Sequence, residues 1–479
     1  MSRMKQVGKS YPLILIALWV TSWYCFFQFR YSYHLFFQEQ NQLFLFSWDY
    51  VSTYFEKPGG LAVLMGDFLT QFFYYRYAGA AILSFCLLLS GLLVYAALRH
   101  FSLKRPVALL ASMATIAFVG VCHFSISYRL SSTIAIIGWL SLLWLVSFVG
   151  SKKIRVLTLL CALCPSWLLF GKPDIRQPGK PDMMLERDLA VDCEYYFGNH
   201  HRVIEMVESS GQLTDAMLFF YNLIQAQIGT LPDHLLEFTP NVLGTFYKIG
   251  PDTPLLTIRN QNELYWLLGD MTFTERAAMM ANVFSHNNRN VRMIKRLAEC
   301  NVVSGDSLAA EKYLRILDKT LLYRQWADNV RTNGRRIYAR KIQLVNHRDT
   351  ITLSDNAHFL MTQLLDAHPD NGIALDYLLC SDLLLKDIAT FKRDYDRYAT
   401  GNAQPDRDVL LHRIHATKLY QEALCIWLAG TNAPQEEWER YIHRPDVMQH
   451  FRAYNAQRGH PRFKDTYWYY FDKLKAPEV

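Results

Sequence analysis

The sequence lacks the short motifs that mark common catalytic and cofactor-binding sites. It has no glycine-rich phosphate loop, no paired CxxC zinc motif, no HExxH and no GxSxG. Strand-like alternation of apolar and polar residues is also rare, so no sheet is predicted. The formal charge of +7 is spread along the chain, which argues against nucleic acid as a partner. We therefore predict no cofactor and no metal, and an enzyme is the less favoured interpretation.

Charged residues are scarce in residues 1–171, where long apolar runs alternate with short polar connections. Roughly 20 apolar residues are needed to cross the hydrocarbon layer of a membrane. We therefore expect a transmembrane domain here, in a chain that is all-α. Its five predicted spans cover about residues 12–29, 78–98, 106–128, 130–150 and 156–170. The last run is the shortest, and whether it crosses decides on which side of the membrane the tail lies.

Basic residues at the ends of these runs predict the orientation. The first run follows a basic segment and ends in bulky aromatic residues instead of a cleavage site, so it is expected to be a retained signal anchor. The larger basic clusters lie before the first run and in every second connection, which places the N-terminus in the cytoplasm by the positive-inside rule. These clusters are Arg3, Lys5 and Lys9, then Arg99, Lys104 and Arg105, then Lys152, Lys153 and Arg155. Five spans would then place the tail outside the cytoplasm.

The connection between the first two runs, residues 36–77, has an unusual composition. It is too polar to span a membrane and too aromatic for a solvated loop, so we expect an interfacial or re-entrant loop, divided by a Lys-Pro-Gly-Gly turn. Carboxylates near a bilayer are costly unless they are paired or hydrated, which makes Glu39, Asp49 and Asp67 weak catalytic candidates. An aromatic belt that anchors the first two spans is the favoured alternative.

The tail is helical in pattern, with apolar residues at three- and four-residue intervals. Residues 172–182 are rich in proline and glycine and are expected to be a linker. Helical repeats are predicted over residues 183–345, and a second helical-repeat block over residues 346–479. Turns are predicted at Gly198, Gly229, Gly269-Asp270 and Gly305-Asp306, and their separations scatter about the tetratricopeptide period of ~34 residues. The tail is therefore predicted to be an irregular tetratricopeptide-like α-solenoid.

Two groups in the tail have the residue types of metal ligands. His201 and Glu205 lie one helical turn apart, but no third ligand is near, so a solvated helix start is preferred. Asp394 and Asp396 lie among basic residues on a predicted helix. A surface face of ion pairs is the interpretation there.

Four segments carry a family resemblance: EQNQLFLFSWDYV, KPGGLAVLMGDFLTQFFYY, LAECNVVSGDSLAAEKYL and ALDYLLCSDLLLKD. Together they resemble an uncharacterised family of Bacteroidota-type inner-membrane proteins with a multi-span N-terminal region and a tetratricopeptide-like tail. The resemblance covers most of the chain. It implies the bacterial inner membrane and no assigned activity, and in that membrane the five-span topology places the C-terminal domain in the periplasm. More distantly, the first span and outer loop are similar to multi-span polyprenol-sugar glycosyltransferases, which would make Asp49 or Glu39 the nearest candidate for their catalytic base.

Two functions remain open from the sequence. In the first, the chain is an envelope scaffold or adaptor, embedded in the lipid bilayer, whose helical-repeat tail binds a protein partner. In the second, it is a lipid-linked glycan enzyme, or a degenerate relative of one, that uses the acids of the outer loop. The first is preferred because the tail shows repeats and no catalytic set.

Overall fold

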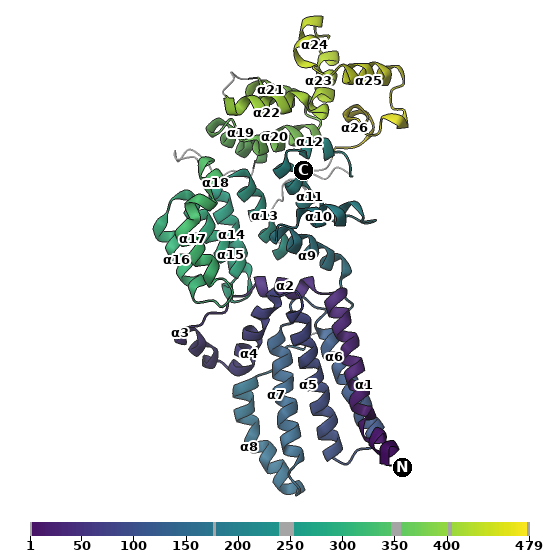
Figure 1. Ribbon diagram of the computed structural model, residues 1–479, viewed down its shortest axis with the longest axis vertical. Helices are drawn as coiled ribbons and strands as arrows, with labels where there is room; N and C mark the ends of the chain where they lie inside the picture. The colour runs from purple at the N-terminus through teal and green to yellow at the C-terminus, as the bar shows by residue number, and fades with distance from the viewer. Residues whose placement is uncertain (1, 176–178, 239–252, 346–355, 401–404, 477–479) are drawn as a thin grey trace. The chain divides into compact units, whose positions relative to one another are not determined.

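The computed structural model describes residues 2–175, 179–238, 253–345, 356–400 and 405–476, and these residues form helices and connections without a β-strand (Figure 1). The predicted all-α class is thereby confirmed. The chain divides into two compact units. The first comprises residues 1–193, 282–298 and 308–333, and the second comprises residues 194–281, 299–307 and 334–479. The predicted boundaries at 171, 182 and 345 stay predictions.

The first unit contains five helices that are long and apolar enough to cross a membrane, the number predicted. They are α1 (Ser2–Phe29), α5 (Ala78–His100), α6 (Arg105–Cys122), α7 (Leu130–Ser147) and α8 (Lys152–Phe170). The third is shorter than predicted and ends at Cys122, where the N–H groups of His123, Phe124 and Ser125 form turns by donating to carbonyls three residues earlier. The fifth is longer than predicted, at 19 residues.

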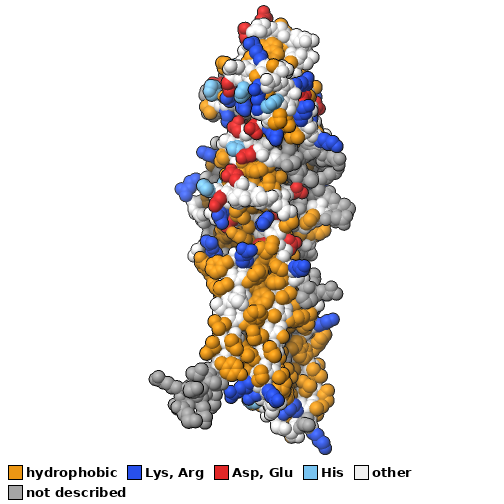
Figure 2. Space-filling model, turned by 90° about the vertical axis from the view of Figure 1, so that its right-hand side faces the viewer, with side chains coloured by type: hydrophobic (Ala, Val, Ile, Leu, Met, Phe, Trp, Pro, Cys, Tyr) orange, Lys and Arg blue, Asp and Glu red, His pale blue; other side chains and the backbone are white. Residues whose placement is uncertain are grey.

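The outer faces of these helices are apolar. Only 6% of the apolar window of α8 is buried within the protein, and Leu157, Leu160 and Leu168 on this helix are 57–61% exposed. Figure 2 shows hydrophobic side chains over this part of the chain, with Lys and Arg side chains at the lower end. Exposed leucines at this density are costly in water and favourable in hydrocarbon, so the surface suggests membrane association.

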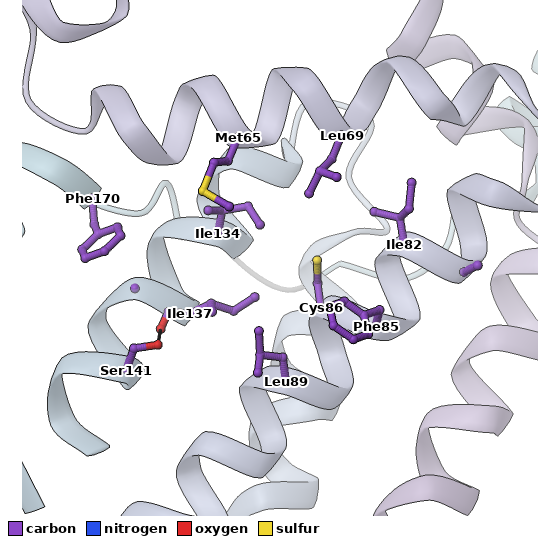
Figure 3. A pocket seen from close by; sticks show the side chains of 12 residues that line it. Met65, Leu69, Ile82, Phe85, Cys86, Leu89, Ile134, Ile137, Ser141 and Phe170 are labelled. Atoms are coloured by element: carbon purple, nitrogen blue, oxygen red, sulfur yellow. Dashed lines mark hydrogen bonds between the residues drawn. The ribbon is translucent and has the colours of Figure 1, made fainter. Parts of the chain in front are cut away.

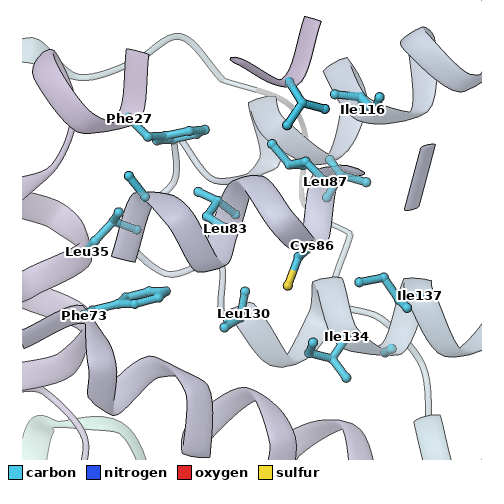
Figure 4. Packing of buried hydrophobic residues seen from close by; sticks show 14 of the residues in the cluster. Phe27, Leu35, Phe73, Leu83, Cys86, Leu87, Ile116, Leu130, Ile134 and Ile137 are labelled. Atoms are coloured by element: carbon cyan, nitrogen blue, oxygen red, sulfur yellow. The ribbon is translucent and has the colours of Figure 1, made fainter. Parts of the chain in front are cut away.

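The inner faces of the same helices pack into one apolar cluster (Figure 4). Phe27 of α1, Leu83 and Leu87 of α5 and Ile116 of α6 are each fully buried there. Because lipid tails are as apolar as leucine, such contacts stabilise the bundle through close packing more than through removal from water.

The loop between α1 and α5 consists of short helical segments. They are α2 (Tyr33–Gln40), α3 (Trp48–Ser52), the 3-10 turn Thr53–Glu56, α4 (Gly60–Thr70) and the 3-10 turn Gln71–Tyr74. Helix α4 packs against α7 and α8. At Gly66 the backbones come so close that an added Cβ would lie 2.5 Å from the Cα of Ser131. The predicted turn before α4 is present, and the N–H of Gly59 donates to the carbonyl of Leu168 at 2.9 Å.

The tail continues the helical pattern. Its first helices are α9 (Met183–Tyr196), α10 (His200–Glu208), α11 (Asp215–Ile228), α12 (Leu231–His234), α13 (Leu255–Leu268), α14 (Met271–Phe284), α15 (Val291–Ser304), α16 (Ser307–Asp318), α17 (Arg324–Ile337) and α18 (Ala339–Gln343). The others are α19 (Ala357–Ala367), α20 (Gly372–Leu384), α21 (Ile388–Ala399), α22 (Pro405–Ala416), α23 (Lys418–Gly430), α24 (Gln435–Tyr441), α25 (Pro445–Ala456) and α26 (Tyr467–Lys473), with 3-10 turns at His286–Asn288 and Pro461–Phe463.

The glycine turns predicted in the tail are confirmed. Gly198, Gly229, Gly269 and Gly305 each end a helix with φ between 74° and 86°, a left-handed conformation that glycine adopts without steric cost. Each turn joins two successive helices, α9 to α10, α11 to α12, α13 to α14 and α15 to α16. The packing of such helices as repeated pairs, and the stacking of the pairs into a solenoid, remain predictions.

Candidate functional site

The loop between α1 and α5 holds the acids that the sequence analysis selected, and helix α2 places the first of them. The carboxylate of Glu186 accepts hydrogen bonds from the backbone N–H groups of Tyr33 and His34, at 2.6 and 3.2 Å. A helix leaves its first N–H groups without partners, so this acid satisfies them and complements the helix dipole. Helix α2 then carries Glu39 in its last turn, on its buried face.

Glu39 lies in a closed polar network. Its residue is 2% exposed, and the hydroxyl of Tyr323 donates to its Oε1 at 2.9 Å. The side-chain amide of Gln40 donates both to the second carboxylate oxygen and, at 2.9 Å, to the Tyr323 hydroxyl. Burial raises the pKa of Glu39 to about 8, and these hydrogen bonds lower it only in part. Most of the Glu39 side chains therefore carry a proton at neutral pH.

A small cavity of about 20 Å³ lies beside Glu39. Polar side chains from the loop and from the tail line it, among them Gln42, Gln71 and Thr320. Its volume is that of about one water molecule, so it offers no room for a substrate.

The loop is also joined to the tail through the backbone. The N–H of Val291 donates to the carbonyl of Gln42 at 3.0 Å, and the N–H of Phe46 donates to the carbonyl of Lys319 at 2.7 Å. Loop residues and the tail segments 282–298 and 308–333 belong to the same compact unit for this reason. Backbone groups in a buried position must find partners, and here the loop and the tail satisfy each other.

Asp67 lies in a second network. It is 7% exposed, its Oδ2 accepts from the hydroxyl of Tyr54 at 2.9 Å, and its Oδ1 lies 3.4 Å from the guanidinium of Arg129. The Tyr54 hydroxyl also lies 2.7 Å from the Tyr50 hydroxyl. The guanidinium of Arg289 lies over the Tyr50 ring, 4.5 Å from the centre of that ring. Burial raises the pKa of Asp67, while Arg129 and Tyr54 lower it in part.

Asp49 differs from the other two acids. It is exposed in the first turn of α3. The structure thus places the sequence-predicted acids in three surroundings, and Glu39 and Asp67 are each buried and hydrogen-bonded to a tyrosine hydroxyl. Neither carboxylate is open to a substrate from the surface. Buried, hydrogen-bonded acids such as Glu39 and Asp67 are suited to holding neighbouring segments of the chain together.

A separate apolar cavity of about 490 Å³ lies between α4, α5, α7 and α8 (Figure 3). Met65 and Leu69 of α4, Phe85 of α5, Ile137 of α7 and Phe170 at the end of α8 point into it. Its volume is in the range of about 300–1,000 Å³ typical of small-molecule sites. The lining is suited to a hydrocarbon chain and offers almost no polar group.

Sequence reasoning missed the partners of the acids. Nothing in the sequence singled out Arg129, Tyr54 or Tyr323 as a partner of these acids. Tyr323 is separated from Glu39 by 284 positions, and no local pattern connects two residues at that distance. Only the folded chain shows that Glu39 and Gln40 of α2 are buried and therefore need partners.

A family model described as "Family of unknown function (DUF6057)" matches residues 9–175 and 172–473. No curated protein and no solved structure matches the chain.

Proposed function

The chain belongs to this family of unknown function, since the match covers nearly all of it, and we propose that it is a membrane-anchored scaffold whose helical tail binds a protein partner. The proposal includes the domain organisation expected from the sequence: spans within residues 1–171, a linker at 172–182, and helical-repeat blocks at 183–345 and 346–479. It also includes the orientation, with the N-terminus in the cytoplasm of a bacterium and the tail in the periplasm.

The proposal rests on the bonds that the buried Glu39 and the backbone of its loop make to the tail. Glu39 binds Tyr323, and the backbone of the same loop binds Val291 and Lys319, so two tail segments are fixed to the helices that could span a membrane. A protein that presents a binding surface at a membrane needs such a rigid base. An enzyme that used Glu39 as a base would need it to face a substrate.

Crosslinking in cells tests this function. A photo-crosslinking amino acid would replace Val409, which is 76% exposed on α22, or Leu308, which is 85% exposed on α16. We expect a discrete adduct with a second protein from at least one of these positions. The matched control is Leu110 on α6, which is 68% exposed and apolar and should yield lipid adducts. Protein adducts that are equally frequent at Leu110, or none in the tail, would contradict the scaffold.

Labelling with a membrane-impermeant thiol reagent tests the orientation. In a background without the exposed Cys25, Cys161 and Cys164, single cysteines would be placed at Lys153 and at Glu56. The proposed topology expects labelling of Glu56→Cys from outside intact cells, and of Lys153→Cys only after the membrane is opened. Labelling of both from one side would overturn it.

A second candidate function, the lipid-linked glycan enzyme, draws on the apolar cavity. Helix α4 contributes Met65 and Leu69 to that cavity and also carries Asp67. A polyprenyl chain in the cavity would bring its head group towards the loop. Replacement of Glu39, Asp49 and Asp67 by their amides should then abolish a change in envelope glycans that the unaltered protein produces. Unchanged glycans in the amide variant would rule this candidate out.

A further inference from the structure

Three side chains in the second unit form a cluster that the sequence analysis did not assemble. His358, Asp382 and Asp394 each offer one ligand atom, and these atoms all lie within 4.8 Å of one another. They come from three successive helices: His358 from the first turn of α19, Asp382 from the last turn of α20 and Asp394 from the middle of α21. Helix α20 packs against both α19 and α21, which places the three ligands on rigid elements.

The basic neighbours of Asp394 predicted a solvated face of ion pairs, but Asp394 does not lie on such a face. Its side chain is 2% exposed, and its Oδ2 lies 2.5 Å from Nε2 of His358. Packing of α21 against α20 turns this carboxylate inward, while Asp396 on the same helix pairs with Lys392. A buried carboxylate beside an imidazole is a pair that a metal ion can bridge.

Asp382 gives a second, independent indication of a ligand. It is 4% exposed, and its Oδ2 has no hydrogen-bond partner in the described part of the chain. A buried carboxylate oxygen without a donor costs free energy, and the nearby carboxylate of Asp394 adds to that cost. A cation between the two acids would satisfy both oxygens.

We propose that His358, Asp382 and Asp394 bind a divalent transition-metal ion. One imidazole and two carboxylates are ligands that Zn²⁺, Mn²⁺ and Fe²⁺ accept. Ligand atoms at about 2.0–2.2 Å from a tetrahedral metal lie about 3.3–3.6 Å apart, so the His358–Asp394 pair, now 2.5 Å apart, would open by about 1 Å. The side chain of His358 is 35% exposed, which leaves a path for the ion and a position for water.

Arg393 is the group that competes with the metal. Its Nε donates to Oδ1 of Asp394 at 3.1 Å, which is the oxygen turned away from His358, and it can keep this hydrogen bond and orient the carboxylate. Its terminal nitrogen lies 3.4 Å from Nε2 of His358 and would have to leave. The side chain is 63% exposed, so that movement is inexpensive.

Metal titration of the full chain in detergent, after removal of metals with a chelator, tests the site. We expect one equivalent of Zn²⁺ or Mn²⁺ to bind and to raise the unfolding temperature. Asp382→Asn and His358→Ala should each weaken this binding by at least about tenfold. Arg393→Gln should strengthen it, because the competing charge is gone. Asp408→Asn and His412→Ala, two exposed residues of α22, are the matched controls and should bind as the unaltered chain does.

The variants also separate loss of the site from loss of the fold. Asp382→Asn replaces a carboxylate oxygen that has no partner, so without metal it should unfold at the same temperature as the unaltered chain or higher. Equal Zn²⁺ binding by Asp382→Asn, His358→Ala and the unaltered chain would overturn the proposal. Binding of Mg²⁺ or Ca²⁺ alone would overturn the assignment to a transition metal.

Discussion

The hydroxyl of Tyr323 donates a hydrogen bond of 2.9 Å to the carboxyl group of Glu39, 284 positions earlier in the chain. Both residues are buried, and this hydrogen bond gives a partner to the buried hydroxyl and to the buried carboxyl group. This bond joins the loop before the second candidate span to the bend that precedes α17 in the tail.

Removal of the Tyr323 hydroxyl is expected to destabilise the first unit. Tyr323→Phe keeps the ring and deprives the buried Glu39 of a donor, which costs about 1–3 kcal/mol. Thermal unfolding in detergent measures the loss. Tyr75→Phe, at a tyrosine that is 51% exposed, is the control and should change little. Equal effects of the two substitutions would mean that the Glu39 hydrogen bond does not contribute.

Stability should fall as the pH rises through the neutral range, and Glu39 should be the cause. Its pKa is raised from 4.5 to about 8 on folding, so the folded state binds the proton more tightly than the unfolded state. The stabilisation that Glu39 contributes is complete below pH 4.5. It falls by up to about 1.4 kcal/mol per pH unit as the pH rises, until the pH passes 8. Glu39→Gln mimics the protonated form and should flatten this dependence, whereas Glu56→Gln at an exposed acid should not. An unchanged slope in Glu39→Gln would contradict the role of Glu39.

The pair of Asp67 and Arg129 should respond unequally to the loss of either partner. Arg129→Gln leaves a carboxylate that is 7% exposed without its cation, whereas Asp67→Asn leaves a guanidinium whose side chain is 26% exposed. We expect Arg129→Gln to cost about 1–3 kcal/mol more than Asp67→Asn in the free energy of unfolding. Arg76→Gln, at an exposed arginine of the same loop, serves as the control. A greater cost for Asp67→Asn would contradict this account of the network.

The contact of α4 with α7 should not tolerate a methyl group. Gly66→Ala would place a Cβ 2.5 Å from the backbone of Ser131, so the two helices would have to separate. Overpacking of this kind costs about 1–3 kcal/mol, and yield and unfolding temperature should both fall. Gly150→Ala provides the matched control, because no atom lies within 4 Å of the added Cβ there. Normal yield and stability for Gly66→Ala would show that α4 is not held by this contact.

The sequence predicted those features that depend on neighbouring residues. Apolar runs gave the five long helices, and glycines between periodic segments gave the turns at Gly198, Gly229, Gly269 and Gly305, because both follow from local preferences. The partners of Glu39 and the burial of Asp394 depend on residues brought together by tertiary packing. The basic neighbours of Asp394 indicated a surface, but Lys392 is itself buried, and the exposed Arg393 reaches Asp394 with a long side chain, so neither reports how deeply Asp394 lies.

The first unit consists of three segments that are separate in the sequence, and this decides when it can assemble during synthesis. Residues 282–298 and 308–333 leave the ribosome long after the loop at 36–77 to which they bind. At about 5–20 residues per second, Tyr323 follows Glu39 by on the order of tens of seconds. During that interval Glu39, the carbonyl of Gln42 and the N–H of Phe46 lack the partners that the tail supplies, and the first unit can close only when about half of the tail has been synthesised. Assembly of this unit is therefore a late event, dominated by contacts between distant parts of the chain, and is expected to be slow.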